Sequence, residues 1–210
     1  WLRKEFGDRL ARFDRYMVSE YTRAMETAAL LNIPRATWYA DSNLREREWG
    51  ALEGLTQDER HKQFGEALAL RDEEPFFWTP PGGESFAHLC TRLRNTLDTL
   101  HRECSDKCVL IVCHGEVMWG FRALLERMSQ ERFKALHLSE NPSDRIFNCQ
   151  ILHYTRHKPG THEVMFYANW FRMIRPTETP VWTSGWQEVV RPRYTNEQLL
   201  EIVSRIPPLI

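Results

Sequence analysis

Residues 108–113 read Cys-Val-Leu-Ile-Val-Cys, an uninterrupted apolar run, and this run constrains the fold more than any other stretch. Six apolar residues with β-branched members in the middle predict a strand buried on both faces of a parallel sheet. His114 and Gly115 follow at once, and a helical apolar pattern begins at Val117. Open α/β sheets bind ligands where a strand ends and a helix begins.

Two interpretations of His114 stay open at this point. Gly115 allows a ligand to approach the backbone closely, and the free N–H groups of the following helix favour an anion, which would make His114 a phosphate-site residue. The alternative is a histidine at the end of a strand that is merely hydrogen-bonded.

Strand-like and helix-like patterns alternate along the chain. Strands are expected at residues 13–19, 36–40 and 108–113, and helices at 20–31, 56–70, 85–103, 117–127 and 129–138. Two alternating segments, 146–154 and 163–169, are expected to pair as a hairpin through a turn at 158–160. This order predicts an α/β fold, a three-layer sandwich whose mostly parallel central sheet is flanked by helices.

The length of 210 residues fits one domain with a small addition. We expect the α/β domain at residues 1–175 and a C-terminal extension at 176–210 that packs on it. The extension holds Trp182, Trp186 and a helical pattern at 196–206. At the other end, residues 1–7 read as the last turns of a helix that stops at Gly7.

Composition narrows the classes of partner. Hydrophobic residues make up 42% and charged residues 27%, with a formal net charge of -1, which is typical of globular domains. Basic residues form no stripe interleaved with aromatic ones, so no nucleic-acid partner is expected. No apolar run approaches the ~20 residues that a membrane helix needs, so no membrane partner is expected either. The sequence does not indicate an oligomeric state.

Five cysteines, an odd number, indicate reduced thiols and hence a cytoplasmic location. His101, Cys104, Cys108 and Cys113 lie close in sequence and raise the question of a zinc site. No pair has the tight spacing of a zinc knuckle, so small buried hydrophobic residues are the preferred interpretation.

Two further motifs carry polar groups. Arg23 lies one turn into the helix that follows the 13–19 strand, which places its guanidinium near the same sheet edge as His114. Glu46 lies in the segment 44–54, where two glycines follow it in a loop that could fold over a pocket. Each residue alone has an ordinary explanation, Arg23 as a solvated helix residue and Glu46 as one of several loop charges.

Together and in this order the motifs resemble the histidine phosphatase superfamily, which includes the cofactor-dependent phosphoglycerate mutases and the fructose-2,6-bisphosphatases. The resemblance runs from about Phe13 to about Tyr167. Its motifs are Ser-x-x-x-Arg at 19–23, Leu-x-Glu-x-x-x-Gly-x-x-Glu-Gly at 44–54, Pro-Gly-Gly-Glu-Ser at 81–85, Val-Cys-His-Gly-Glu at 112–116, and the strand that bears Asn148.

The resemblance implies a phosphomonoester phosphatase that works through a phosphohistidine. Arg23 would neutralise phosphoryl oxygens, His114 would be the second, non-nucleophilic histidine, and Gly115 would offer its backbone N–H to the phosphate. Glu46 would protonate the leaving oxygen and then activate water, with Glu84 as a competing acid. The substrate is a small phosphorylated molecule, and no metal or other cofactor is implied.

One motif of the family is absent from these residues. The family's first strand ends in Arg-His-Gly, which supplies the nucleophilic histidine, and no Arg-His-Gly occurs among the 210 residues. We expect an upstream segment to hold it, so that the 1–175 domain lacks its first strand here. The alternative is a non-catalytic relative that serves as a scaffold or interaction protein.

Phosphatase and mutase branches differ in a substrate-binding insertion. The mutases carry paired arginines there, whereas residues 66–83 offer only Arg71 beside Glu73, Glu74 and an aromatic cluster. This segment favours the phosphatase branches, with a phosphoglycerate mutase-type phosphotransferase as the alternative. Acidic residues facing a pocket would repel a second phosphate, which favours a monoester with apolar or ring character.

Overall fold

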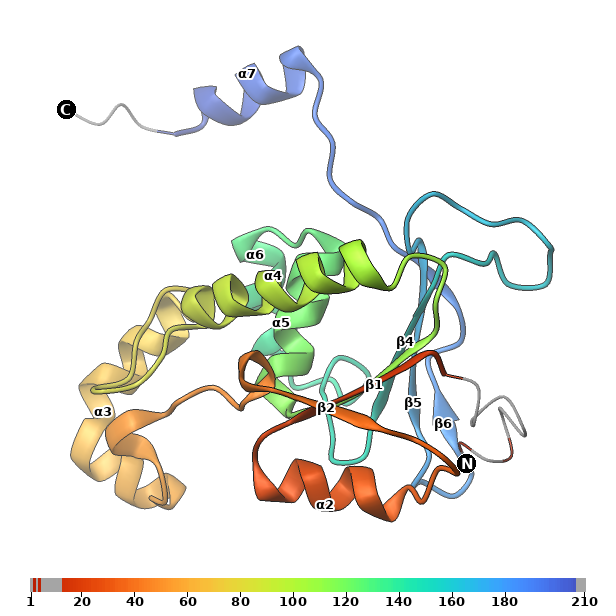
Figure 1. The fold of residues 1–210 in the computed structure, drawn as a ribbon. Helices are drawn as coiled ribbons and strands as arrows, with labels where there is room; N and C mark the ends of the chain where they lie inside the picture. Colours follow the sequence, from red (N-terminus) through yellow and green to blue (C-terminus); the bar gives the residue numbers. More distant parts are fainter. Residues whose placement is uncertain (1, 3, 5–12, 207–210) are drawn as a thin grey trace.

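The structure, a computed structural model, describes residues 2, 4 and 13–206. Its centre is a parallel sheet in which β1 (Arg15–Ser19) lies between β2 (Trp38–Asp41) and β3 (Val109–Val112) (Figure 1). β3 is apolar throughout, and β1 carries the apolar residues Tyr16, Met17 and Val18 in its middle, as expected of strands covered on both faces.

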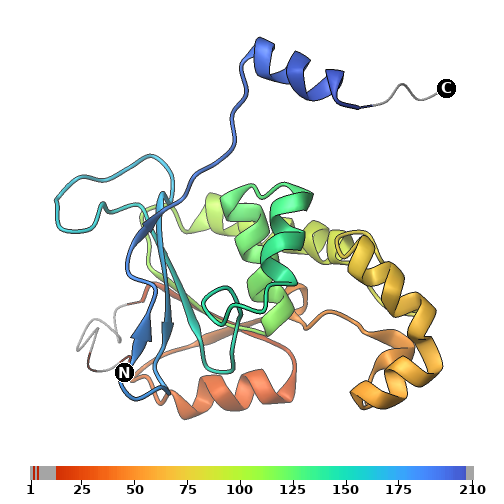
Figure 2. The ribbon, with the colours of Figure 1, turned by 180° about the vertical axis from the view of Figure 1, so that it is seen from behind.

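Helices cover both faces of the parallel sheet, as the sequence predicts. α2 (Thr22–Leu30) lies on one face, and α4 (Phe86–Glu103) and α5 (Gly115–Glu126) lie on the other (Figures 1 and 2). The side chains of β1 alternate accordingly, because Val18 packs with Ala24 of α2 whereas Met17 joins the core around α4 and α5. The expectation of an α/β fold with a mostly parallel sheet flanked by helices is therefore confirmed.

β3 is less buried than the sequence suggests. All four of its residues are half-buried rather than buried. Within the part of the chain that the structure describes, β3 pairs only with β1, so its second edge is not covered by another strand.

α3 (Gln57–Glu73) lies to one side of the sheet (Figure 1). It begins with the expected capping box, in which Thr56 and Glu59 bond to each other's backbone, and it kinks at Phe64. α6 (Gln130–His137) follows α5 and inserts Phe133 into the main core. Among the described residues, no helix is both long enough and apolar enough to cross a membrane.

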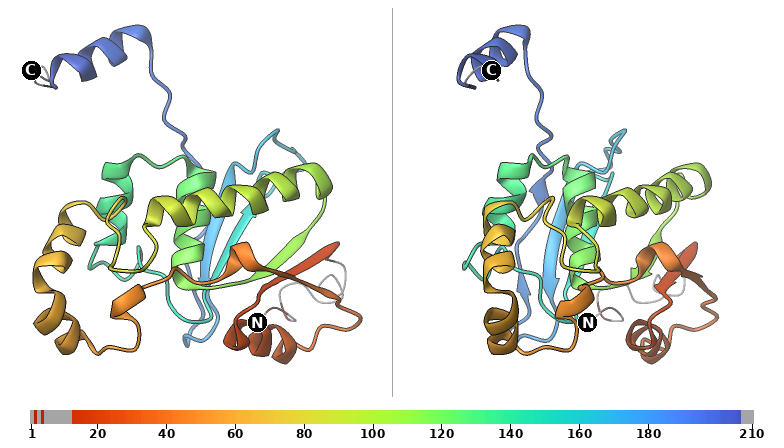
Figure 3. Two further views of the ribbon diagram at one scale, coloured as in Figure 1. Left: turned by 60° about the vertical axis from the view of Figure 1, so that its left-hand side comes forward. Right: turned by 90° about the vertical axis from the view of Figure 1, so that its left-hand side faces the viewer.

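A second, antiparallel sheet lies alongside α5 (Figure 3). Its strands are β4 (Ile151–Thr155), β5 (Trp170–Arg175), β6 (Trp182–Thr183) and β7 (Gln187–Glu188). The expected first strand is correct only from Ile151 onward, because residues 146–150, which include Asn148, lie outside any strand. The expected second strand is wrong, because β4 pairs with β5 and not with 163–169. The alternating 163–169 segment belongs to a long loop, in which an isolated bridge pairs His157 with Val164.

The segment after Pro176 contributes β6 and β7, both of which pair with β5. The expected helix near the C-terminal end is present as α7 (Asn196–Ser204), which has no buried residue and projects from the rest of the molecule (Figure 1). The helix end expected at residues 1–7 lies outside the described residues, apart from Leu2 and Lys4.

Candidate active site

Three parallel strands end at the same edge of the central sheet. β1 ends at Ser19, β2 at Asp41, and β3 is followed by Cys113 and His114. Their carboxyl ends form the edge where open α/β sheets bind ligands. The polar side chains at this edge are therefore the candidate catalytic and ligand-binding groups.

His114 is the N-cap residue of α5 and is only 7% exposed. The Nε of Arg23 donates a hydrogen bond of 3.2 Å to Nδ1 of His114. Its Nε2 lies 2.8 Å from the hydroxyl oxygen of Ser19. Because Nδ1 accepts, the proton of the neutral ring is on Nε2, which donates to Ser19.

The surroundings keep His114 neutral. Burial, which is the largest cause, and the positive charges of Arg23 and Arg92 together lower its pKa from 6.5 to about 4. The ring of Tyr21 packs edge-on against the imidazole with its centroid 5.3 Å away. The orientation of His114 is therefore set by three neighbours, which lie at the end of β1, at the N-cap of α2 and in the first turn of α2.

Glu46 lies in the loop after the short 3-10 helix Ser42–Leu44. Its Oε1 accepts a hydrogen bond of 2.9 Å from the backbone N–H of Arg47. Burial raises the pKa of Glu46 and the charge of Glu116 adds to this, while the Arg47 hydrogen bond and the charge of Arg23 only partly offset the rise. A carboxyl with a raised pKa, near enough to the Arg23 guanidinium to feel its charge, is suited to proton transfer.

Glu84, the competing acid, is engaged in a fork-to-fork ion pair. Its two oxygens accept from Nε and Nη2 of Arg92 at 2.8 and 2.9 Å. Arg92 also donates to the backbone carbonyls of Asn43 and Glu46. The pair therefore ties the start of α4 to the loop that carries Glu46, and it leaves the Glu84 carboxylate with less freedom to transfer a proton.

A buried arginine, Arg47, holds the loop that carries Glu46 in place through several hydrogen bonds. The side chain of Arg47 is 1% exposed and donates to the backbone carbonyls of Glu84 and Trp78 and to the carboxylate of Glu116. Burial alone would raise the pKa of Glu116, but hydrogen bonds and charge from His137 and Arg47 outweigh it and lower the pKa. Glu116 therefore supplies the negative charge that compensates the buried Arg47.

The two loops that border the site touch through their backbones. The N–H of Ala51 donates to the carbonyl of Pro81, and the N–H of Glu84 donates to the carbonyl of Glu48, both over 2.8 Å. A Cβ on Gly83 would lie 2.5 Å from the Glu48 carbonyl oxygen, so this approach requires glycine. By contrast, a Cβ on Gly115 would meet nothing within 4 Å, which leaves open space at the start of α5.

A cavity of about 260 Å³ opens beside these groups. It is lined by Arg45, Glu46, Glu48, Gly83, Glu84, His88 and Arg92. No cluster of three or more histidine, cysteine, aspartate or glutamate residues suited to a metal ion occurs in the described part of the chain. All five cysteines are free; Cys104 is buried as expected, whereas Cys108 is exposed and its expected burial is wrong.

The structure thus places Arg23 and His114 in direct contact, and Glu46 near enough for the charge of Arg23 to act on its pKa. Sequence reasoning assigned no role to Ser19, Arg92 or Arg47. Ser19 could have been found from its place at the end of a strand. The contacts of Arg47 could not, because its partners lie 31 to 69 positions away along the chain.

The chain is similar in sequence to known proteins. The family model of the histidine phosphatase superfamily (branch 1) matches residues 3–159. A 6-phosphofructo-2-kinase/fructose-2,6-bisphosphatase of Gallus gallus is 34% identical over 114 residues, which are 54% of this chain and 23% of that protein. The corresponding protein 1 of Homo sapiens gives the same identity and coverage. The chain therefore spans about a quarter of the length of these curated relatives.

Solved structures show the same similarity. A mycobacterial glucosyl-3-phosphoglycerate phosphatase aligns with a TM-score of 0.51 at 27% identity, over 60% of this chain and 65% of that one. The alpha-ribazole phosphatase of Shigella flexneri aligns with a TM-score of 0.52 at 23% identity, over 61% and 67%, a likeness of fold alone. Since the family model covers most of the chain and its motifs meet at one sheet edge, the chain belongs to the histidine phosphatase superfamily.

Proposed function

We propose that this protein is a phosphatase that hydrolyses phosphomonoesters through a phosphohistidine intermediate. The observation that carries the proposal is the hydrogen-bonded group of Ser19, His114 and Arg23 at the carboxyl edge of the parallel sheet, with Glu46 beside it. The curated relatives named above include a fructose-2,6-bisphosphatase activity in their names, and a mycobacterial phosphatase shares the fold.

The phosphoryl group would bind where positive charge and backbone donors converge. The Arg23 guanidinium offers a fork of N–H groups that suits phosphoryl oxygens. The N-terminus of α5, including the Gly115 N–H, faces the same edge and favours an anion. Open space beside Gly115 supports close approach of the phosphate to this backbone.

His114 would stabilise charge and would not attack phosphorus. A nucleophilic imidazole needs a free lone pair, but Nδ1 of His114 accepts from Arg23 and Nε2 donates to Ser19. The nucleophile of the proposed reaction is the histidine of the expected Arg-His-Gly segment. Its attack would form an N–P bond as the bond from phosphorus to the leaving oxygen breaks.

Glu46 would carry both proton transfers. Protonated Glu46 would donate to the leaving oxygen in the first step, and the resulting carboxylate would take a proton from water as water attacks the phosphohistidine. The raised pKa of Glu46 supports its protonated state before the first step. The ion pair of Glu84 with Arg92 supports the choice of Glu46 over Glu84.

The substrate class follows from the cavity lining. Glu46, Glu48 and Glu84 line the 260 Å³ cavity together with Arg45 and Arg92. With Glu46 protonated, the two arginines are balanced by Glu48 and Glu84, so no excess positive charge is available to bind a second phosphate. We therefore propose a small phosphomonoester with a neutral, apolar or ring-bearing leaving group.

Steady-state release of phosphate from p-nitrophenyl phosphate by the purified natural protein tests the proposal. We expect turnover, together with an acid-labile, base-stable phosphoryl label on histidine after rapid quenching. A folded protein that releases no phosphate and takes up no label would indicate the non-catalytic scaffold. Transfer of the label to a second phosphorylated metabolite faster than to water would indicate a mutase-type phosphotransferase.

A further inference from the structure

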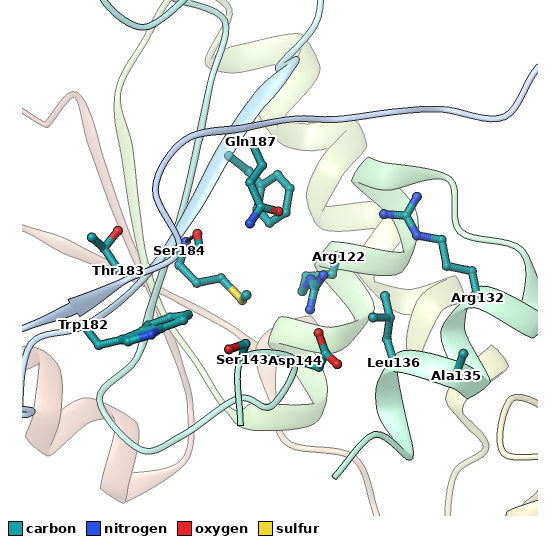
Figure 4. Close-up of a pocket in the computed structure, with 12 residues that line it drawn as sticks. Arg122, Arg132, Ala135, Leu136, Ser143, Asp144, Trp182, Thr183, Ser184 and Gln187 are labelled. Carbon is teal, nitrogen blue, oxygen red and sulfur yellow. Dashed lines mark hydrogen bonds between the residues drawn. The ribbon is translucent and has the colours of Figure 1, made fainter. Parts of the chain in front are cut away.

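A second cavity of about 530 Å³ lies at the other end of α5 from His114 (Figure 4). Arg122 lines it and follows His114 by eight residues on α5, which is about 12 Å along a helix. α6, the loop around Asp144, β5 and the β6–β7 segment form the other walls. Its volume is within the range of about 300–1,000 Å³ that is usual for small-molecule sites.

The guanidinium of Arg122 has an unused donor. Arg122 is 4% exposed and donates from Nε to Glu126 over 3.0 Å, yet its buried Nη1 has no hydrogen-bond partner among the described residues. The rings of Trp119 and Phe171 lie 4.7 and 5.7 Å from its Cζ and hold the side chain in place. A buried donor without an acceptor is costly, so an acceptor entering the cavity would relieve that cost.

Two positive charges share one carboxylate next to this cavity. Arg132, the second arginine of the lining, donates from Nη2 to Oε2 of Glu126 over 3.2 Å, while Arg122 uses Oε1. The group of Arg122, Arg132 and Glu126 therefore has an excess of positive charge. It suits the carboxylate end of a ligand.

Asp144, on the loop after α6, adds a negative charge to the lining of the cavity. Figure 4 shows Arg122 between Asp144 and Gln187, with the Asp144 carboxylate directed toward the middle of the group. Asp144 accepts a hydrogen bond of 2.7 Å from the Ser139 hydroxyl, and within the described chain it forms no ion pair. Its carboxylate can therefore accept a hydrogen bond from an ammonium group of a ligand.

Apolar side chains line other parts of the cavity wall. Leu136, Phe171, Met173 and Trp182 all contribute to the wall. Trp182 is fixed by Arg175, whose Cζ lies 4.0 Å from the indole centroid. The cavity thus combines two cations, one anion and an aromatic surface within one open cleft.

We propose that this cavity binds a small amphoteric molecule, an amino acid with an apolar or aromatic side chain being the simplest case. Its carboxylate would meet Arg122 and Arg132, its ammonium group would meet Asp144, and its side chain would lie against Phe171 and Trp182. The proposal does not depend on the proposed function, because it concerns binding alone.

Calorimetric titration with three probes tests the assignment of charges. L-phenylalanine carries both charged groups, 3-phenylpropionate lacks the ammonium group, and 2-phenylethylamine lacks the carboxylate. We expect L-phenylalanine to bind about tenfold or more tightly than either analogue, which corresponds to about 1.4 kcal/mol for the weaker of the two charged contacts. Equal affinity for 3-phenylpropionate, or no saturable binding of L-phenylalanine in the millimolar range, would overturn the proposal.

Two variants localise the binding. Ala135→Phe adds bulk from an exposed lining position on α6 and is expected to abolish binding of L-phenylalanine, whereas Ala69→Phe on α3, exposed and outside the cavity, is its matched control. Asp144→Asn should weaken the binding of L-phenylalanine about tenfold and leave the affinity for 3-phenylpropionate unchanged. Circular dichroism of each variant checks the fold, and binding that survives Ala135→Phe in a folded protein rules out this cavity.

Discussion

His114 forms hydrogen bonds with both ring nitrogens at once, accepting from Arg23 and donating to Ser19. An alanine at this position removes a preorganised group from the pocket where phosphoryl charge develops. We expect His114→Ala to lower the turnover of p-nitrophenyl phosphate by about a hundredfold or more. The control is His101→Ala, in the last turn of α4. Near-normal turnover of a folded His114→Ala protein would show that His114 has no part in catalysis.

The lowered pKa of His114 also predicts how stability changes with pH. The unfolded chain titrates this histidine near pH 6.5 and the folded chain near pH 4, so between these values the unfolded state binds more protons. Its contribution to stability is therefore present above about pH 6.5 and is lost as the pH falls toward 4.

Urea denaturation of the wild type and of His114→Gln across pH 4–7 measures this contribution. We expect the difference in free energy of unfolding to grow with pH by a few kcal/mol at most, since one pKa unit corresponds to about 1.4 kcal/mol. A difference that stays constant over this range would show that the folded pKa of His114 is ordinary.

Glu46 is expected to be needed most where the leaving group is poor. Glu46→Gln should slow alkyl phosphates much more than activated aryl esters, whose leaving oxygen needs little protonation. Since the proton donor is the acid form, wild-type turnover of alkyl phosphates should fall as pH rises through the raised pKa of Glu46, and the variant should lose this limb. Parallel losses on both substrate types would instead assign the acid role to Glu84 or to water.

At the residue scale, the sequence predicted which residues lie at the site better than it predicted which groups they contact. Arg23 and His114 follow from patterns local to one strand and one helix start, and the structure joins them by a hydrogen bond. The three acceptors of the Arg47 guanidinium come from Trp78, Glu84 and Glu116, and no local pattern connects such distant segments. A buried cation is therefore a long-range property that short motifs do not reveal.

Among the elements, the loops 44–54 and 75–85 depend on each other. Gly83→Ala would bring a Cβ to 2.5 Å from the Glu48 carbonyl oxygen and 2.9 Å from the Gly50 nitrogen, so one loop has to move. We expect a loss of about 1–3 kcal/mol in stability and a lower turnover, because the displaced loop carries Glu46. The matched control is Gly65→Ala on α3, where a Cβ would meet nothing within 4 Å.

Thermal unfolding and turnover of both variants check this prediction. Gly65→Ala should be neutral or slightly stabilising, because alanine favours the helix by up to about 1 kcal/mol over glycine. If Gly83→Ala unfolds and turns over like the wild type, the two loops do not constrain each other.

The antiparallel hairpin shows where element prediction fails. Residues 163–169 alternate as a strand should, yet they lie in the long loop, and the strand that pairs with β4 is Trp170–Arg175. Four of the six residues in β5 are buried, including Arg175, so its sequence lacks a clear polar face. Alternation of apolar and polar residues identifies strands with one solvent-exposed face, and β5 is not such a strand.

At the scale of the whole molecule, Glu126 connects helices α5 and α6 to the antiparallel sheet. It lies on α5, is 1% exposed, and accepts from Arg122, from Arg132 and from the Tyr154 hydroxyl of β4. Burial, together with the charge of Glu126, raises the pKa of Tyr154, so its proton stays in this bond. Glu126→Gln leaves two arginines without their counter-charge, and we expect a loss of about 3 kcal/mol in the free energy of unfolding.

Chemical denaturation of Glu126→Gln, with Glu140→Gln on the exposed loop as the control, measures this loss. Two separate unfolding transitions in the Glu126→Gln variant would show that the parallel and antiparallel sheets hold together mainly through this residue. A change below about 0.5 kcal/mol, the size of an ordinary surface substitution, would contradict the role given to Glu126.

α5 carries His114 at its first turn and Arg122 two turns later, and this limits how the protein can be recombined. One inserted residue between them would rotate everything after it by about 100° and move Arg122 away from its cavity while His114 stayed in place. A chimera with its crossover inside this helix would take His114 and Arg122 from different relatives. Successful crossovers are therefore expected before Cys108 or after Arg127, with the helix inherited whole.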